Sequence, residues 1–227
     1  MTYLKGHWQL IAILVVVFAL WSTPVVLPLK ILIVFLHELA HALMTLLTGG
    51  EVLEMSISAQ QGGHVISRGG SRFLILTAGY LGSLVIGVGL LLAALRTRAD
   101  RVVVAVFGMV MLGVAVLYMR DFFALGFTLA TGLALLAMSR YLPNDLNDMT
   151  LRIIGLSSLV YVPFDIFDDT IRRSGARSDA YMLAEEFGGP TMLWGGLWLV
   201  LSGVVIVWCL RHILGQDSNL HVSSLRA

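Results

Sequence analysis

Charged residues are scarce in this sequence. Only 13% of its 227 residues are Asp, Glu, Lys or Arg, about half the share found in an ordinary soluble domain. Hydrophobic residues make up 58% and the mean hydropathy is +0.88. This balance argues against a soluble protein and indicates a chain that lies in a lipid bilayer. The net charge of +1 gives no sign of a basic surface, so nucleic acid is not an expected partner.

Cysteine is nearly absent as well. Cys209 is the single cysteine of the chain, which excludes an internal disulfide and a thiolate metal cluster. Because Cys209 lies in the last apolar run, we expect it to be a small buried side chain.

Long apolar runs are abundant. A run of about 20 apolar residues crosses a bilayer as a helix, and the pattern predicts an integral, multi-pass, all-α polytopic membrane protein with six or seven transmembrane helices. No small-residue cleavage site follows the first run, so we expect it to be retained as a helix. Basic residues are spread evenly over the two sides of such a bundle, so they do not set its orientation. The candidate spans are Leu10–Leu27, Leu29–Thr48, Phe73–Leu95, Val102–Met119, Phe122–Met138, Leu151–Phe167 and Met192–Leu214.

Two stretches are too polar for a membrane span. In residues 49–72, apolar positions are spread among polar ones and Gly62–Gly63 interrupts them, which predicts two short strands around a turn, a β-hairpin-like insertion. Residues 165–191 form a charged segment. We expect one membrane domain over residues 1–214 and a loose tail over 215–227. The link at Arg120–Asp121 is either a short connection or a kink.

The run FLHELAHALMTLLTGG, residues 35–50, contains two histidines and a glutamate among apolar side chains. Burying such groups is costly unless a partner holds them. His37 and His41 are four residues apart, so they share one face of a helix. That spacing suits one zinc ion, and Glu38 can then act as general base on a water at the metal. The alternative is a pair of core histidines with Glu38 paired elsewhere.

The other histidines, His7, His64, His212 and His221, are at predicted loops or span ends. We expect them to be solvated surface residues.

Several segments together resemble a known family. HELAHALMTLLTGG, the strand-like segment, SRFLILTAGYLGSLVIG, DIFDD and RSDAYMLAEEFGGPTMLWGGLW are similar to the compact, site-2-protease-like intramembrane zinc metalloproteases of bacteria and plants, over about residues 30–205. The resemblance implies a zinc-dependent protease that cuts a transmembrane protein substrate within or beside the bilayer, in a bacterial cell membrane. It gives no indication of oligomeric state.

A catalytic zinc takes three protein ligands and leaves one position open. In the family the third ligand is an aspartate, usually in a Leu-Asp-Gly motif, and this sequence has no such motif. Asp179 opens a helix that is followed by a Gly-Pro break and the final span, a layout similar to the family's. Asp165 is the alternative. Asp179 could instead cap the helix with Ser178.

Two further aspartates, Asp168 and Asp169, are one turn before Arg172 and Arg173. We expect these residues to form ion pairs along a helix.

Small residues in AGYLGSLVIGVG, residues 78–89, predict a helix that packs closely against the zinc helix. In the family the matching stretch usually reads Gly-Pro followed two residues later by Asn. Tyr80 and Ser83 are at those places here, so the substrate-binding role of that Asn does not carry over.

Zinc would activate the water and polarise the scissile carbonyl, and Glu38 would move the proton. Residues 52–67 would either offer a strand edge to an extended substrate or only support the fold. Two other functions remain open. One is an inactive relative that binds membrane proteins as a scaffold, and the other is a transporter in which buried His and Asp groups move ions.

Overall fold

The computed structural model describes residues 5–173, 175, 177–213 and 218–219. A 3-10 turn, η1 (Pro24–Val26), leads into α3, and one π-helical turn, η2 (Asp168–Arg172), ends α7. The strands are β1 (Glu51–Ile57) and β2 (Gly63–Arg68). The helices are α2 (Trp8–Ala19), α3 (Leu27–Leu47), α4 (Arg72–Arg96), α5 (Asp100–Tyr118), α6 (Phe122–Tyr141), α7 (Asn144–Phe167), α8 (Asp179–Phe187) and α9 (Thr191–Ile213).

In this part of the chain six helices are long and apolar enough to cross a membrane: α3, α4, α5, α6, α7 and α9. The chain is therefore an integral, multi-pass membrane protein. The prediction of a span over Leu10–Leu27 is wrong. Helix α2 has 12 residues, about 18 Å at 1.5 Å per residue, which is less than the roughly 30 Å of a bilayer core. It ends in a turn in which the Thr23 hydroxyl donates to the Leu20 carbonyl at 2.6 Å, and Pro24 then begins η1.

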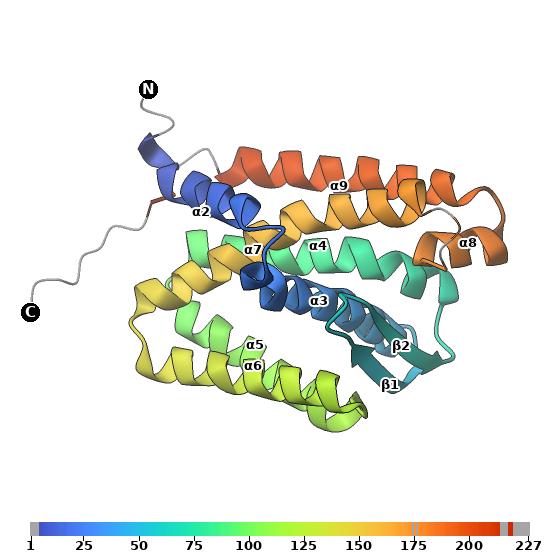
Figure 1. Ribbon diagram of the computed structural model, residues 1–227, viewed down its shortest axis with the longest axis horizontal. Helices are drawn as coiled ribbons and strands as arrows, with labels where there is room; N and C mark the ends of the chain where they lie inside the picture. Colours follow the sequence, from blue (N-terminus) through green and yellow to red (C-terminus); the bar gives the residue numbers. More distant parts are fainter. Residues whose placement is uncertain (1–4, 174, 176, 214–217, 220–227) are drawn as a thin grey trace, which may run out of the picture.

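Helix α3 runs through the middle of the bundle (Figure 1), with α4, α7 and α9 on one side and α5 and α6 on the other. On one side Phe35 packs against Phe107 of α5 with ring centroids 6.5 Å apart. On the other, Gly82 of α4 lies against α3 so closely that an added Cβ would be 2.7 Å from the Cβ of Ala40. Gly79 and Gly82 of α4 thus pack against α3 as the sequence predicted. Gly87 instead packs against Ser158 of α7, and a Cβ added at Gly89 would have no neighbour within 4 Å.

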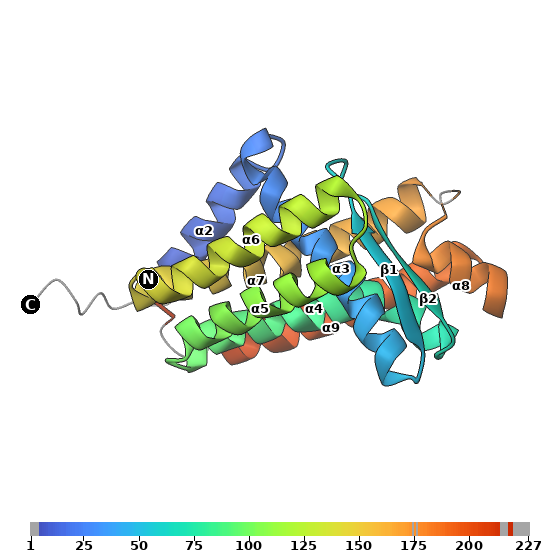
Figure 2. The same ribbon diagram turned by 90° about the horizontal axis from the view of Figure 1, so that it is seen from below.

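The two strands predicted within residues 49–72 are present as a hairpin. β1 and β2 are antiparallel, with a register irregularity between Val52 and Glu54. Val52, Met55 and Ile57 are buried because this face of β1 packs against the bundle. Figure 2 shows the hairpin lying across α3, at the end of the bundle where α8 is found.

Of the two alternatives for the link at Arg120–Asp121, the structure has the short connection, and one helix also starts earlier than predicted. The link at Arg120–Asp121 separates two helices that pack against each other, and Asp121 caps α6 by accepting from the Ala124 N–H at 2.8 Å. Helix α7 begins at Asn144, seven residues before the predicted Leu151.

Two described segments far apart in the sequence, Gly6–His7 and Ser218–Asn219, meet at the end of the bundle away from the hairpin, where α2 begins (Figure 1). His7 is buried and bonds to the Ser218 hydroxyl at 2.7 Å, so the prediction that His7 is a solvated surface residue is wrong. The Ser218 N–H donates to the Gly6 carbonyl at 2.9 Å. Apart from Ser218 and Asn219, the predicted loose tail, 215–227, lies outside the described residues, as does His221.

Candidate metal centre

Helix α3 presents two imidazoles to one point. The Nε2 atoms of His37 and His41 are 3.0 Å apart, as expected for residues one helical turn apart. Nδ1 of His41 is 2.7 Å from the Ile75 carbonyl of α4. Because a carbonyl can only accept, Nδ1 of His41 carries the proton, and Nε2 of the neutral ring keeps its lone pair for the site.

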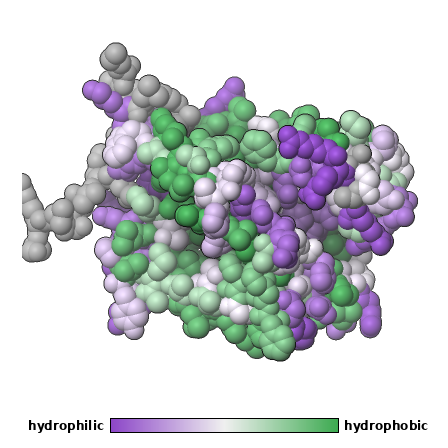
Figure 3. All heavy atoms as spheres, viewed as in Figure 1, coloured by the Kyte–Doolittle hydropathy of each residue, from purple (hydrophilic) through white to green (hydrophobic). Residues whose placement is uncertain are grey.

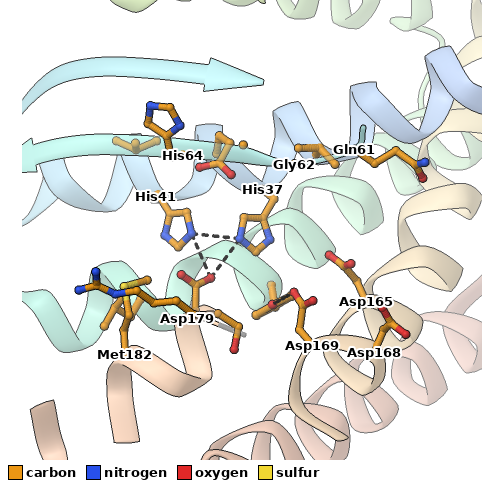
Figure 4. Close-up of a pocket in the computed structure, with 18 of the residues that line it drawn as sticks. His37, His41, Gln61, Gly62, His64, Asp165, Asp168, Asp169, Asp179 and Met182 are labelled. Carbon is orange, nitrogen blue, oxygen red and sulfur yellow. Dashed lines mark hydrogen bonds and ion pairs between the residues drawn. The ribbon is translucent and has the colours of Figure 1, made fainter. Parts of the chain in front are cut away.

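Asp179 reaches this point from the opposite side (Figure 4). Its Oδ2 is 3.0 Å from Nε2 of His37 and 3.1 Å from Nε2 of His41. The helix α8 is capped by Ser178, whose hydroxyl accepts from the Tyr181 N–H at 3.3 Å. The carboxylate of Asp179 is therefore free of the capping role and faces the histidines. Burial would raise the pKa of Asp179, but when the two imidazoles are protonated, the charge of His41 and then the hydrogen bond from His37 hold this pKa below its usual range.

The three donor atoms suit a small divalent ion. One ligand atom from each of His37, His41 and Asp179 lies within 4.8 Å of the others. Ligands about 2.0–2.1 Å from a tetrahedral zinc lie roughly 3.3 Å from one another, so the observed separations of 3.0–3.1 Å need only a small spread. Two nitrogens and one carboxylate oxygen are a common donor set for zinc.

The backbone of α4 forms one wall of this centre. A Cβ added at Gly79 would lie 2.5 Å from Nε2 of His37 and 2.5 Å from Nε2 of His41. Only a residue without a side chain fits there, so Gly79 allows α4 to approach the imidazoles. From the sequence, this glycine was predicted only to pack against the zinc helix. Its place one helical turn before Ser83 was the one sign that it lies on the face toward the histidines.

The centre opens into a cavity of about 870 Å³ that also receives residues of α7 and β2. Figure 3 shows hydrophilic side chains around a hollow on this face, with hydrophobic ones over much of the rest. Glu38 is buried and its carboxylate lines the cavity, so close to β2 that a Cβ added at Gly63 would be 2.6 Å from Oε1. Asp165 lines the same cavity but does not belong to the group of three donors found among the described residues.

The predicted ion pairs at the end of α7 are present. Arg173 bonds to Asp168 at 2.8 Å and to Asp169 at 2.5 Å, and Arg172 lies 3.7 Å from Asp168. Asp169 has a second partner that the sequence did not suggest, because it also accepts from the Tyr80 hydroxyl at 2.6 Å.

Two of the histidines predicted to be solvated, His64 and His212, are exposed as expected. His64 lies on β2 and lines the cavity.

Comparison with known proteins agrees with this geometry. The model of one family, described as Peptidase M50B-like, matches residues 10–209. No curated protein and no solved structure matches the chain. The matched range contains all six spans except the last turn of α9, and it includes the hairpin and the candidate centre. The chain therefore belongs to the Peptidase M50B-like family, a site-2-protease-like family of intramembrane metalloproteases.

Proposed function

We propose that this chain is an active zinc-dependent endopeptidase that hydrolyses peptide bonds of membrane proteins within or next to the bilayer. His37, His41 and Asp179 would hold the metal, and Glu38 would act as general base. The observation that carries the proposal is the convergence of two imidazole nitrogens and one carboxylate oxygen, 3.0–3.1 Å apart, at the edge of a polar cavity in a chain of this family.

Zinc bound there would lower the pKa of a water and polarise the scissile carbonyl. The chain's own part is to orient the reactants and to move the proton. Glu38 follows His37 directly in α3 and its carboxylate lines the same cavity, so it can accept a proton from the attacking water and return it to the leaving amine. The lack of a side chain at Gly63 leaves room for this carboxylate against β2.

The substrate must present an extended segment, because a helix hides its peptide bonds. β2 supports such a presentation. Gly63, His64 and Val65 line the cavity, and β2 pairs with β1 along one edge only in the two-stranded sheet of the described residues. An extended peptide can add to a strand edge through main-chain hydrogen bonds. Pairing along β2 would carry the scissile bond past Glu38, whereas β1 packs against the bundle.

The proposal is tested with purified protein in detergent and in proteoliposomes that contain a panel of single-span membrane proteins. We expect wild type to contain zinc and to cleave members of the panel. Glu38→Gln should keep the zinc and lose cleavage by at least about a hundredfold, and His41→Ala should lose both. His212→Ala, a change at an exposed histidine of α9, is the matched control and should retain both.

Two results would overturn the proposal. Full turnover by Glu38→Gln would remove Glu38 from its role. Zinc in wild type without cleavage of any panel member would favour a metal-stabilised scaffold, and zinc uptake into the proteoliposomes would favour a transporter.

A further inference from the structure

The two histidines of the centre are held in different ways. The ring of His41 is fixed by the bond from Nδ1 to the Ile75 carbonyl at 2.7 Å, an arrangement typical of metal ligands. The ring of His37 instead meets the ring of Tyr80 edge to face, with centroids 4.6 Å apart and an interplanar angle of 82°. Among the described residues no hydrogen bond to Nδ1 of His37 is found. Beyond the contacts of its Nε2 with Asp179 and His41, the His37 ring is therefore oriented by an aromatic contact.

Tyr80 is well suited to hold a neighbouring ring in place. It is one of the largest fully buried side chains of the protein. Its other side packs against Trp198 of α9, with centroids 5.3 Å apart, so the ring cannot move away from His37. Its hydroxyl donates to Asp169 at 2.6 Å, which holds the outer end of the side chain in place.

Asp169 is itself held by the π-helical turn η2. The Arg173 N–H donates to the Asp168 carbonyl at 2.8 Å and so closes the wide turn. The Arg173 guanidinium bonds to Asp169 at 2.5 Å. Within the same turn the Thr170 hydroxyl donates to the Ile166 carbonyl at 2.6 Å. A π turn adds one residue to a helical turn and is frequent at functional sites, and here it brings the Asp169 carboxylate to the Tyr80 hydroxyl.

From these contacts we infer that Tyr80 is a positioning residue for the metal centre. Its ring sets the orientation of the His37 imidazole, and Asp169 fixes Tyr80 through the hydroxyl. The inference rests on the proposed function, because it takes His37 to be a metal ligand. It also links the polar segment after α7 to the metal through a continuous series of contacts, Arg173 to Asp169 to Tyr80 to His37.

The test uses full-length protein in which Co²⁺ replaces zinc, because the visible absorption of Co²⁺ reports ligand geometry independently of cleavage. Zinc affinity is measured in parallel by competition with a chelator. Tyr80→Leu removes the aromatic contact, Tyr80→Phe removes only the hydroxyl, and Asp169→Ala removes its acceptor. Phe35→Leu is the matched control, since Phe35 is an equally buried ring on α3 that faces α5.

We expect Tyr80→Leu to shift the Co²⁺ spectrum and to weaken zinc binding about 10- to 100-fold, the range for loss of a group that orients a ligand. Tyr80→Phe and Asp169→Ala should give a smaller, equal loss, and the double variant should lose no more than either one. Phe35→Leu should leave the spectrum and the affinity unchanged.

Unchanged spectra and affinities in Tyr80→Phe and Tyr80→Leu, with wild type binding one metal, would overturn this inference alone. If Tyr80→Leu does not fold, the Tyr80→Phe and Asp169→Ala pair decides by the same criteria. A wild-type protein that binds no metal, or one whose metal survives His41→Ala, would overturn the proposed function and this inference with it.

Discussion

Two groups of buried polar side chains lie at opposite ends of the bundle, and they are built differently. At the end where α2 begins, the Arg152 guanidinium donates to both Asp148 and the Ser218 carbonyl, and His7 bonds to the Ser218 hydroxyl. In this group, hydrogen-bond donors are paired with acceptors of the same chain. At the other end, three groups direct nitrogen or carboxylate atoms at one another beside a cavity. A cluster in which donors and acceptors are paired within the chain supports the fold, whereas converging ligand atoms at the edge of a cavity form an arrangement that could hold a cation.

Mutations in the two groups should differ most in their effect on the free energy of unfolding. Arg152→Met would leave the buried carboxylate of Asp148 without its partner, which costs about 3–5 kcal/mol of unfolding free energy. The double variant Asp148→Leu/Arg152→Met should recover much of this loss, because no charge is left unpaired. Denaturant titration in detergent measures both, and zinc content should equal that of wild type. Loss of zinc in the double variant would contradict the independence of the two ends.

The next effect concerns the wall of the metal centre. Gly79→Ala would place a Cβ 2.5 Å from both Nε2 atoms, and overpacking of this kind costs about 1–3 kcal/mol. We expect zinc affinity to fall by roughly 5- to 150-fold, as measured by chelator competition. Gly89→Ala, on the same helix but with no atom within 4 Å of the added Cβ, is the control. Equal affinities in the two variants would show that α4 yields at Gly79 without disturbing the histidines.

A smaller effect should separate proton transfer from metal binding. Gly63→Ala would press on the Glu38 carboxylate, because the added Cβ would be 2.6 Å from Oε1, and Glu38 is flexible enough to swing aside. We expect cleavage to fall by about tenfold, since displacing a catalytic group by about 1 Å can cost up to a hundredfold, with zinc content unchanged. Gly62→Ala, whose nearest neighbour would be 3.5 Å away, should cleave like wild type. A matched loss in both would assign the effect to the turn and not to Glu38.

The end of the bundle with the candidate metal centre and the hairpin could be predicted better from the sequence than the opposite end. Its polar residues are set in apolar sequence at helical spacing, and the hairpin has an interrupted strand pattern, so residue type and period indicate both. The position of Asp179 relative to the histidines depends on how α8 packs against α4 and α9, which is long-range structure. Spacing along the chain could not choose between Asp179 and Asp165, and whether either acts as a ligand remains a prediction.

At the opposite end, the predictions for the start of α7, for His7 and for the first span were wrong, each for a physical reason. Residues 143–148 read PNDLND, a composition typical of a loop, yet α7 begins at Asn144 directly after Pro143, and Asp148 pairs with Arg152 inside this helix. His7 has a polar partner far along the chain, Ser218, which no local pattern reveals. The first apolar run failed as a span because its length was counted across the turn at Leu20–Thr23, where the helix stops.

We propose that two histidines of α3 and the aspartate that opens α8 hold one metal ion. The decisive measurement is the zinc content per chain of wild type, Asp179→Ala and Asp165→Ala, purified in parallel without added metal. We expect about one zinc in wild type and in Asp165→Ala, and loss of that zinc in Asp179→Ala. Wild type without zinc, or zinc that survives Asp179→Ala and disappears in Asp165→Ala, would contradict it.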